Sequence, residues 1–198
     1  KDYNYELVKD SQIDFIKFNS TDGYRIYSRT LKMVLYMALT QLYSTTGVEF
    51  IATINKDQFF VTKNIELNDD KIKEIKEKML EIIKKDYPII KKNVSLEEAT
   101  ILYTASNDED KLENFENKIR SSVTMYFCDG MYNYFYGLLA PSTGYIKTFD
   151  LIRYRNGALL VIPDENMNVK KEVKEDRLYQ TFIDFNKFNE VLGIENVG

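Results

Sequence analysis

Residues 133–150 have the glycine and proline spacing of a reactive turn, but their side chains offer no reactive group. Gly137, Pro141 and Gly144 direct the backbone, because glycine tolerates positive φ angles and proline fixes φ. The side chains that would face a site in this segment are hydrocarbon ones: Phe135, Leu138 and Leu139. None of them can ligate a metal ion or transfer a proton. The segment therefore indicates a scaffold that was kept after its chemistry was lost.

The choice of nucleophiles is restricted by composition, since the chain has no histidine and a single cysteine, Cys128. Without histidine, every Ser/His and Cys/His nucleophilic pair is excluded, and so is a Cys/His zinc site within one chain. One functional hypothesis is a hydrolase that uses Cys128 or Asp129 instead of histidine. It is weaker than the two hypotheses that are given at the end of this subsection. No base is adjacent, so we expect Cys128 to be a small buried hydrophobic residue in an apolar strand.

Several polar side chains could bind a small ligand near residues 133–150. The candidates are Arg29, Lys32, Ser142, Thr143, Lys147 and Arg153. The cations could receive a phosphate or a carboxylate. Exposed Lys and Arg are common, however, and their simpler interpretation is that they are solvated ends of ordinary elements. The two hydroxyls stand beside Pro141, where turn residues usually hydrogen-bond the local backbone.

The charge pattern argues against nucleic-acid binding. The formal net charge is −4, and Lys alternates with Asp and Glu along the chain, so no uniformly basic face is predicted. Aromatic residues between 126 and 136 could stack on a base, but without a basic groove we expect them to pack in the core. No apolar run reaches bilayer length and no signal peptide is evident, and a lone cysteine fits a reducing, cytoplasmic location.

The first two thirds of the chain show clear element signals. Residues 5–8 and 13–18 are expected to pair as strands, followed by a long helix over 24–43 with helical apolar spacing. Segments 48–54 and 58–63 flank a turn and predict a hairpin. Asn68 caps a charged helix that ends before Pro88, residues 89–94 are extended, and Ser95 starts a helix that ends at residue 104. A further helix is predicted over 108–119.

The remaining third predicts a sheet and a tail. Residues 121–128 and 145–154 alternate as strands, and Asn156-Gly157 joins the second to 158–162, which suggests one antiparallel sheet in this half. A polar linker then precedes a helix over 178–192. The fold class expected is α+β, an antiparallel sheet packed with helices. Residues 1–164 form the domain, and 165–198 form a linker and a C-terminal helix.

The element order and the residues of 133–144 resemble the editing-type domain shared by threonyl- and alanyl-tRNA synthetases. Threonyl-tRNA synthetases carry D-x-C-x-G-P-H-x-P-S-T-G in this place, and Gly137, Pro141, Ser142, Thr143 and Gly144 match it. The resemblance covers most of residues 24–164. It implies the common-domain fold of these synthetases, in which that segment belongs to the editing site.

The same resemblance places the family's reactive residues on inert positions. The Cys falls on Phe135 and the His of that signature on Leu139, while the two histidines of the H-x-x-x-H signature fall on Arg29 and Met33. These four residues would line a vestigial cleft. Editing needs those groups to hold a metal or a water and the aminoacyl ester, so we expect no deacylation of tRNA and no metal.

A further resemblance, to the N-terminal region of bacterial uridine kinase-like proteins, rests on Tyr134-Phe135-Tyr136-Gly137, on Pro141 to Tyr145 and on the ending 192–198. In that family this domain precedes a P-loop kinase domain, which would bring ATP and Mg²⁺. The chain lacks the G-x-x-x-x-G-K-[ST] loop and begins with Lys1 rather than Met, so we expect a piece of a longer protein.

The leading functional hypothesis is therefore a non-catalytic accessory or regulatory domain of a uridine kinase-like protein. It needs no cofactor itself, and its partners would be the fused kinase domain and a second copy in a homodimer. The alternative is a binding module whose emptied cleft holds a small effector such as a nucleoside, a nucleotide or an amino acid. Neither a membrane nor a nucleic acid is expected as a partner.

Overall fold

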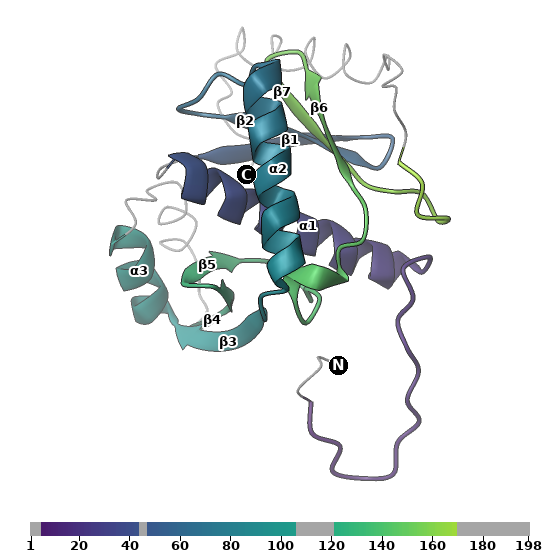
Figure 1. Ribbon diagram of the computed structural model, residues 1–198. Coiled ribbons are helices and arrows are strands. Elements are labelled where there is room, and N and C mark those ends of the chain that lie inside the picture. The colour runs from purple at the N-terminus through teal and green to yellow at the C-terminus, as the bar shows by residue number, and fades with distance from the viewer. Residues whose placement is uncertain (1–4, 44–46, 106–120, 170–198) are drawn as a thin grey trace, which may run out of the picture.

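The computed structural model describes residues 5–43, 47–105 and 121–169, and its architecture is α+β, as expected. Helix α1 runs across the view between a four-stranded sheet at the top and a three-stranded sheet at the bottom, and α2 crosses it and extends upward along the four-stranded sheet, where it contacts β6 (Figure 1). Both sheets are entirely antiparallel. Within the described residues no helix is both long and apolar enough to span a membrane.

The long helix α1, Thr21–Tyr43, forms the centre of the core. It begins three residues earlier than predicted, because Ser20 Oγ accepts the Gly23 N–H at 3.1 Å as a helix cap. Its middle is fully buried on more than one face, including Leu31, Met33 and Leu35. A helix buried on several faces must be covered by different elements, which here include α2 and η1.

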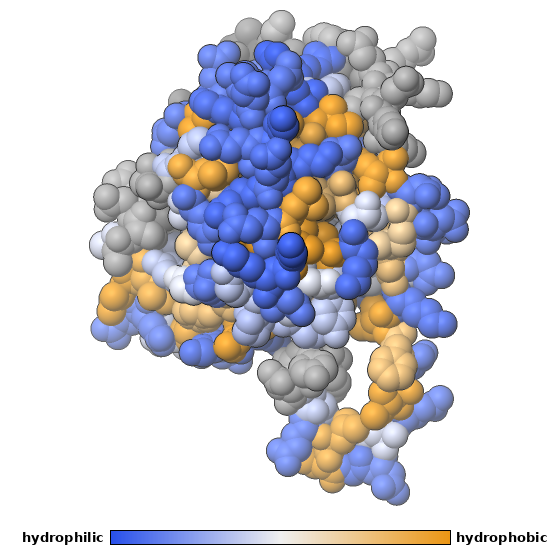
Figure 2. Space-filling model, viewed as in Figure 1, coloured by the Kyte–Doolittle hydropathy of each residue, from blue (hydrophilic) through white to orange (hydrophobic). Residues whose placement is uncertain are grey.

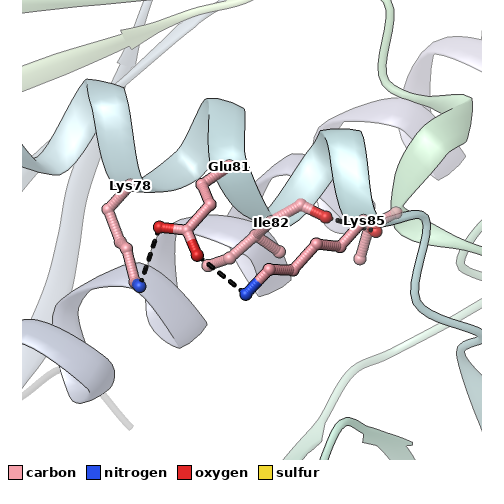
Figure 3. A network of polar contacts seen from close by, with 5 residues as sticks. Lys78, Glu81, Ile82 and Lys85 are labelled. Carbon is pink, nitrogen blue, oxygen red and sulfur yellow. Dashed lines mark hydrogen bonds and ion pairs between the residues drawn. The ribbon is translucent and has the colours of Figure 1, made fainter.

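The charged helix α2, Asp69–Lys85, matches its prediction closely. Asn68 Oδ1 accepts the Lys71 N–H at 2.9 Å, and the helix ends at Asp86 in the left-handed conformation with φ 51°. Its outer face is largely hydrophilic (Figure 2). On this face Glu81 lies between Lys78 and Lys85, 3.0 Å and 2.7 Å from their Nζ atoms (Figure 3).

The four-stranded sheet has the order β1-β2-β7-β6. The predicted hairpin is confirmed as β1, Val48–Ile54, and β2, Asp57–Thr62, joined by Asn55 and Lys56, which both have positive φ as a two-residue hairpin turn requires. The second hairpin consists of β6, Asp150–Tyr154, and β7, Gly157–Val161. Every residue of β7 is buried, as befits a central strand.

The three-stranded sheet has the order β3-β4-β5. Strands β3, Ile90–Ser95, and β4, Ser122–Cys128, follow the prediction, whereas β5, Met131–Tyr134, was not predicted. The turn at Asp129-Gly130 has positive φ at both residues and returns the chain along β4. Helix α3, Leu96–Ala105, starts where Ser95 Oγ accepts the Glu98 N–H at 3.0 Å.

The single antiparallel sheet predicted for the C-terminal half is wrong, because β4 and β5 form a sheet with β3, while β6 and β7 form a sheet with β1 and β2. The predicted strand over 145–154 is also too long. Thr143–Tyr145 form a 3₁₀ turn, η1, held by the end of α2, and the strand begins only at Asp150. The segment between the two hairpins thus carries the chain from one sheet to the other.

The strand pair predicted for residues 5–8 and 13–18 is also wrong. The described residues 5–17 contain no strand, and Val8 and Phe15 are each 83% exposed. In Figure 1 this segment runs out from the body of the domain, so no strand of either sheet lies beside it to hydrogen-bond with it. The predicted helices over 108–119 and 178–192 fall outside the described residues, and the division at residue 164 stays a prediction.

Candidate functional site

The segment from Gly137 to Gly144 is held by polar groups of both central helices. Thr30 on α1 is the residue that sequence reasoning missed. It is fully buried, and its Oγ1 accepts the Ala140 N–H at 2.8 Å while donating to the Ile26 carbonyl at 2.8 Å. A threonine at a helical apolar position gives no signal in the sequence, because its partner lies on a segment 110 residues away.

The hydroxyls of Ser142 and Thr143 are committed to the C-terminal end of α2. Thr143 Oγ1 donates to the Ile82 carbonyl at 3.0 Å and accepts the Tyr87 N–H at 2.9 Å. Ser142 Oγ donates to the Asp86 carboxylate. The partners are therefore distant in sequence, contrary to the local backbone bonds that the turn predicts, and they leave Thr143 fully buried.

Asp86, the residue that ends α2, binds both Ser142 and Gly144. Its Oδ1 accepts the Gly144 N–H at 2.9 Å, and a Cβ at position 144 would lie only 2.3 Å from that oxygen. Hydrogen bonds, first from Ser142 and then from Gly144, hold the pKa of this carboxyl below its usual value. Glycine is therefore required at position 144, because the Asp86 carboxylate leaves no room for a Cβ there. Ser142, Thr143 and Gly144 together bind the C-terminal end of α2 through hydrogen bonds.

Arg29 lies directly against Gly137. A Cβ on Gly137 would be 2.8 Å from both Cζ and Nη1 of Arg29, and Gly137 has φ 102°, a backbone conformation that side-chain-bearing residues rarely adopt. The Gly137 carbonyl accepts a hydrogen bond from the Tyr126 hydroxyl at 2.6 Å, which ties this peptide to β4 of the three-stranded sheet. The structure thus brings α1 and the Gly137 turn into contact through a guanidinium group.

The other three positions of the predicted cleft are apolar and packed. Met33 is fully buried and Leu139 is 9% exposed, and both belong to the main hydrophobic cluster. Phe135 is partly buried against that cluster, with its ring 6.3 Å from the ring of Tyr126. Apolar side chains at these places fill space but do not supply the charge or the strong hydrogen-bonding group needed to polarise a carbonyl group or position a water molecule.

Lys32 lies one turn from Arg29 on α1 and is partly buried. Its Nζ is 4.2 Å from the centre of the Phe50 ring, a cation-π contact. Burial, followed by the charge of Arg29, lowers the pKa of Lys32. Arg29 and Lys32 are thus neighbouring cations on α1, with Arg29 against Gly137 and Lys32 against Phe50 of β1.

Lys147 and Arg153 each have a partner elsewhere and do not belong to this pair of cations. Lys147 Nζ donates to the Gly144 carbonyl at 2.8 Å. Arg153 on β6 lies 3.9 Å from Asp69 at the start of α2, whereas Ser142 binds at its end. Since 17 helical residues span about 25 Å, Arg153 lies well away from the Gly137 turn.

Cys128 is buried at the end of β4. Burial, with a smaller contribution from the charge of Asp129, raises the pKa of its thiol to about 12, which suppresses the thiolate that a nucleophile needs. In the part of the chain that the structure describes, no three Cys, Asp or Glu side chains are grouped so as to hold a metal ion.

The fold is that of an α+β domain, and comparison with known proteins shows similarity to part of threonine-tRNA ligases. The chain is 30% identical over 154 residues to a threonine-tRNA ligase of Ligilactobacillus salivarius, covering 76% of the chain. It is 28% identical over 155 residues to that of Thermotoga petrophila, and 26% identical over 155 residues to threonine-tRNA ligase 2 of Bacillus subtilis.

The chain therefore contains a threonyl-tRNA synthetase-like domain, as the resemblance implied. It spans only about a quarter (24%) of the length of these relatives. No protein-family profile matches it.

Proposed function

We propose that this chain is a non-catalytic accessory domain of a longer protein, in which the synthetase-like scaffold is kept and ester hydrolysis is lost. One observation carries the proposal. The four positions on which the resemblance places the reactive residues hold a guanidinium packed on Gly137 and three apolar side chains, two of them buried in the core.

Hydrolysis of an aminoacyl ester requires a group that activates water or polarises the ester carbonyl. A guanidinium group such as that of Arg29 has only hydrogen-bond donors and no acceptor, so it does not supply a general base. The buried Cys128 is held as a thiol, and the hydroxyls of Ser142 and Thr143 are used to close α2. These properties favour a domain that binds, orients or regulates rather than one that hydrolyses.

The longer protein that we propose is a uridine kinase-like enzyme with a cytoplasmic location. Its P-loop domain would follow this domain and would bind ATP and Mg²⁺, while this domain would orient or regulate it, or pair two copies of the protein. The proposal rests on the resemblance of the Tyr134 to Tyr145 segment and of the last residues to such proteins. Sequencing the gene beyond the codon for Gly198 tests it, since a P-loop should follow.

The absence of hydrolysis is tested with threonine tRNA that carries the wrong amino acid. The 198-residue chain is incubated with this tRNA, and the corresponding region of the Bacillus subtilis ligase serves as the comparison. We expect release of amino acid at the spontaneous rate, and no zinc in the purified protein. Release well above that rate would show that a different residue set still works.

The second candidate is a binding module for a small effector, a nucleoside, a nucleotide or an amino acid. It is favoured by the two adjacent cations, Arg29 and Lys32, beside a turn without reactive side chains. Accessory and binding roles are compatible, because a bound effector could regulate a fused enzyme.

A further inference from the structure

We infer that Arg29 and Lys32 together bind one oxyanion, the phosphate or carboxylate group of a small ligand, at the surface between α1, β1 and the Gly137 turn. The inference extends the second candidate function by naming the recognised chemistry. It is independent of whether the domain hydrolyses esters.

The spacing of the two cations on α1 allows them to act on one anion. Residues three apart on a helix lie on the same side, about 5–6 Å apart at Cβ, and the mutual repulsion of these two charges contributes to the lowered pKa of Lys32. Two like charges held together are destabilising unless an anion lies between them. A guanidinium and an ammonium that share an oxyanion would supply that compensation.

Neither cation has a carboxylate partner among the described residues, although other cations of the domain do. Arg25, one turn earlier on α1, lies 3.9 Å from Asp22, and Lys76 lies 2.6 Å from Asp150. Exposed lysines without partners are ordinary, but Arg29 and Lys32 are partly buried. Partial burial of a charge that has no carboxylate partner carries a desolvation cost, so a pair of such charges points to an external anion.

The surroundings keep Arg29 in place. Glycine at 137 leaves the space that the guanidinium occupies, since a Cβ there would lie 2.8 Å from Cζ. Phe50 holds Lys32 from β1 through its ring face, 4.2 Å from Nζ. A site whose cations are positioned before binding loses less side-chain entropy when the anion arrives.

The inference is tested by thermal unfolding of the 198-residue chain in the presence of inorganic phosphate, acetate or uridine monophosphate. Sodium chloride at matched ionic strength is the reference. The variants are Arg29→Ala and Lys32→Ala, and the control is Arg25→Ala, which removes an exposed arginine from the same helix. Isothermal titration then gives dissociation constants for each anion that stabilises the wild type.

We expect stabilisation by at least one anion, retained in Arg25→Ala and weakened at least tenfold in affinity in both other variants. Stabilisation by phosphate and uridine monophosphate alone would identify a phosphate ligand, and stabilisation by acetate alone a carboxylate ligand. Arg29→Lys, which keeps the charge, should retain part of the affinity and guards against a variant that fails to fold.

Equal stabilisation of the wild type and of Arg29→Ala by every anion would overturn the inference, because it would reflect a general salt effect. No stabilisation beyond chloride would overturn it as well. Either result would leave the prediction on ester hydrolysis intact, since that depends on missing reactive groups rather than on anion binding.

Discussion

The guanidinium of Arg29 occupies the space that a side chain at Gly137 would fill, with Cζ 2.8 Å from the position of the missing Cβ. The contact joins the helix and the turn on which the synthetase resemblance places reactive residues. Glycine at position 137 thus makes room for the Arg29 guanidinium. The same contact therefore bears on both the proposed absence of ester hydrolysis and the proposed recognition of an anion.

Gly137→Ala should separate backbone strain from the position of Arg29. With φ at 102°, alanine should cost about 1–3 kcal/mol of unfolding free energy. Gly130→Ala is the matched control, because Gly130 has φ 74° and no atom within 4 Å of the added Cβ. A flexible guanidinium can move aside, so both variants should lose similar stability in urea unfolding, while only Gly137→Ala should lose anion binding. Unchanged anion binding in Gly137→Ala would contradict this account.

Thr30→Val should reveal how strongly α1 holds the Gly137 to Gly144 segment. Valine keeps the shape of threonine but leaves the buried Ala140 N–H unpaired, which should cost about 1–3 kcal/mol. Thr40→Val is the control, since Thr40 makes only the bond to the carbonyl one turn back, and it should change stability by less than about 0.5 kcal/mol. The measurement is the urea midpoint of unfolding of each variant, compared at an unchanged dependence of unfolding free energy on urea concentration. Equal losses of unfolding free energy in the two variants would refute the role of Thr30.

The connection between Asp86 and Gly144 should make stability depend on acid. The folded pKa of Asp86 lies below its ordinary value of 3.8, so the unfolded chain binds the proton more readily. The stabilisation is therefore complete above pH 3.8 and is lost as the pH falls through the folded pKa. Asp86→Asn tolerates the left-handed backbone and has no such titration.

The measurement compares the free energy of unfolding of the wild type and of Asp86→Asn between pH 2 and 7. The advantage of the wild type should be constant near neutrality and should shrink at acid pH. A difference that stays constant down to the lowest pH would show that the carboxylate charge contributes nothing to this connection.

Cys128 should be inert toward thiol reagents in the folded state. Raising its pKa from an ordinary 9.0 to about 12 leaves about a thousandfold less thiolate at pH 8, and burial further restricts access. The rate of labelling by an aromatic disulfide should rise steeply on unfolding in urea. Rapid labelling of the native protein would reopen the hypothesis of a cysteine hydrolase.

The helices and hairpins could be predicted because their signals are local. Asn68 and Ser95 cap α2 and α3 as expected, and the Asn55-Lys56 turn closes the first hairpin. The division into two sheets could not be predicted, since it depends on Thr143 binding α2 from far along the sequence. The apolar residues of 5–18 suggested strands because composition cannot tell whether a pairing strand is present.

At the candidate site, the sequence indicated which groups were missing but not what replaced them. The loss of histidine and the turn from Gly137 to Gly144 could be read directly. The packing of Arg29 on Gly137 and the burial of Thr30 depend on tertiary contacts. Residue types alone therefore pointed to an emptied cleft, whereas Met33 and Leu139 are packed in the core.

The central claim is tested most directly by the rate at which this chain releases amino acid from mischarged threonine tRNA. Radiolabelled tRNA is followed over time with the chain, with the matching region of the Bacillus subtilis ligase, and with no protein. The account predicts that the first and third time courses coincide, with and without added zinc. Release tenfold faster than the protein-free rate, and proportional to the concentration of this chain, would contradict it.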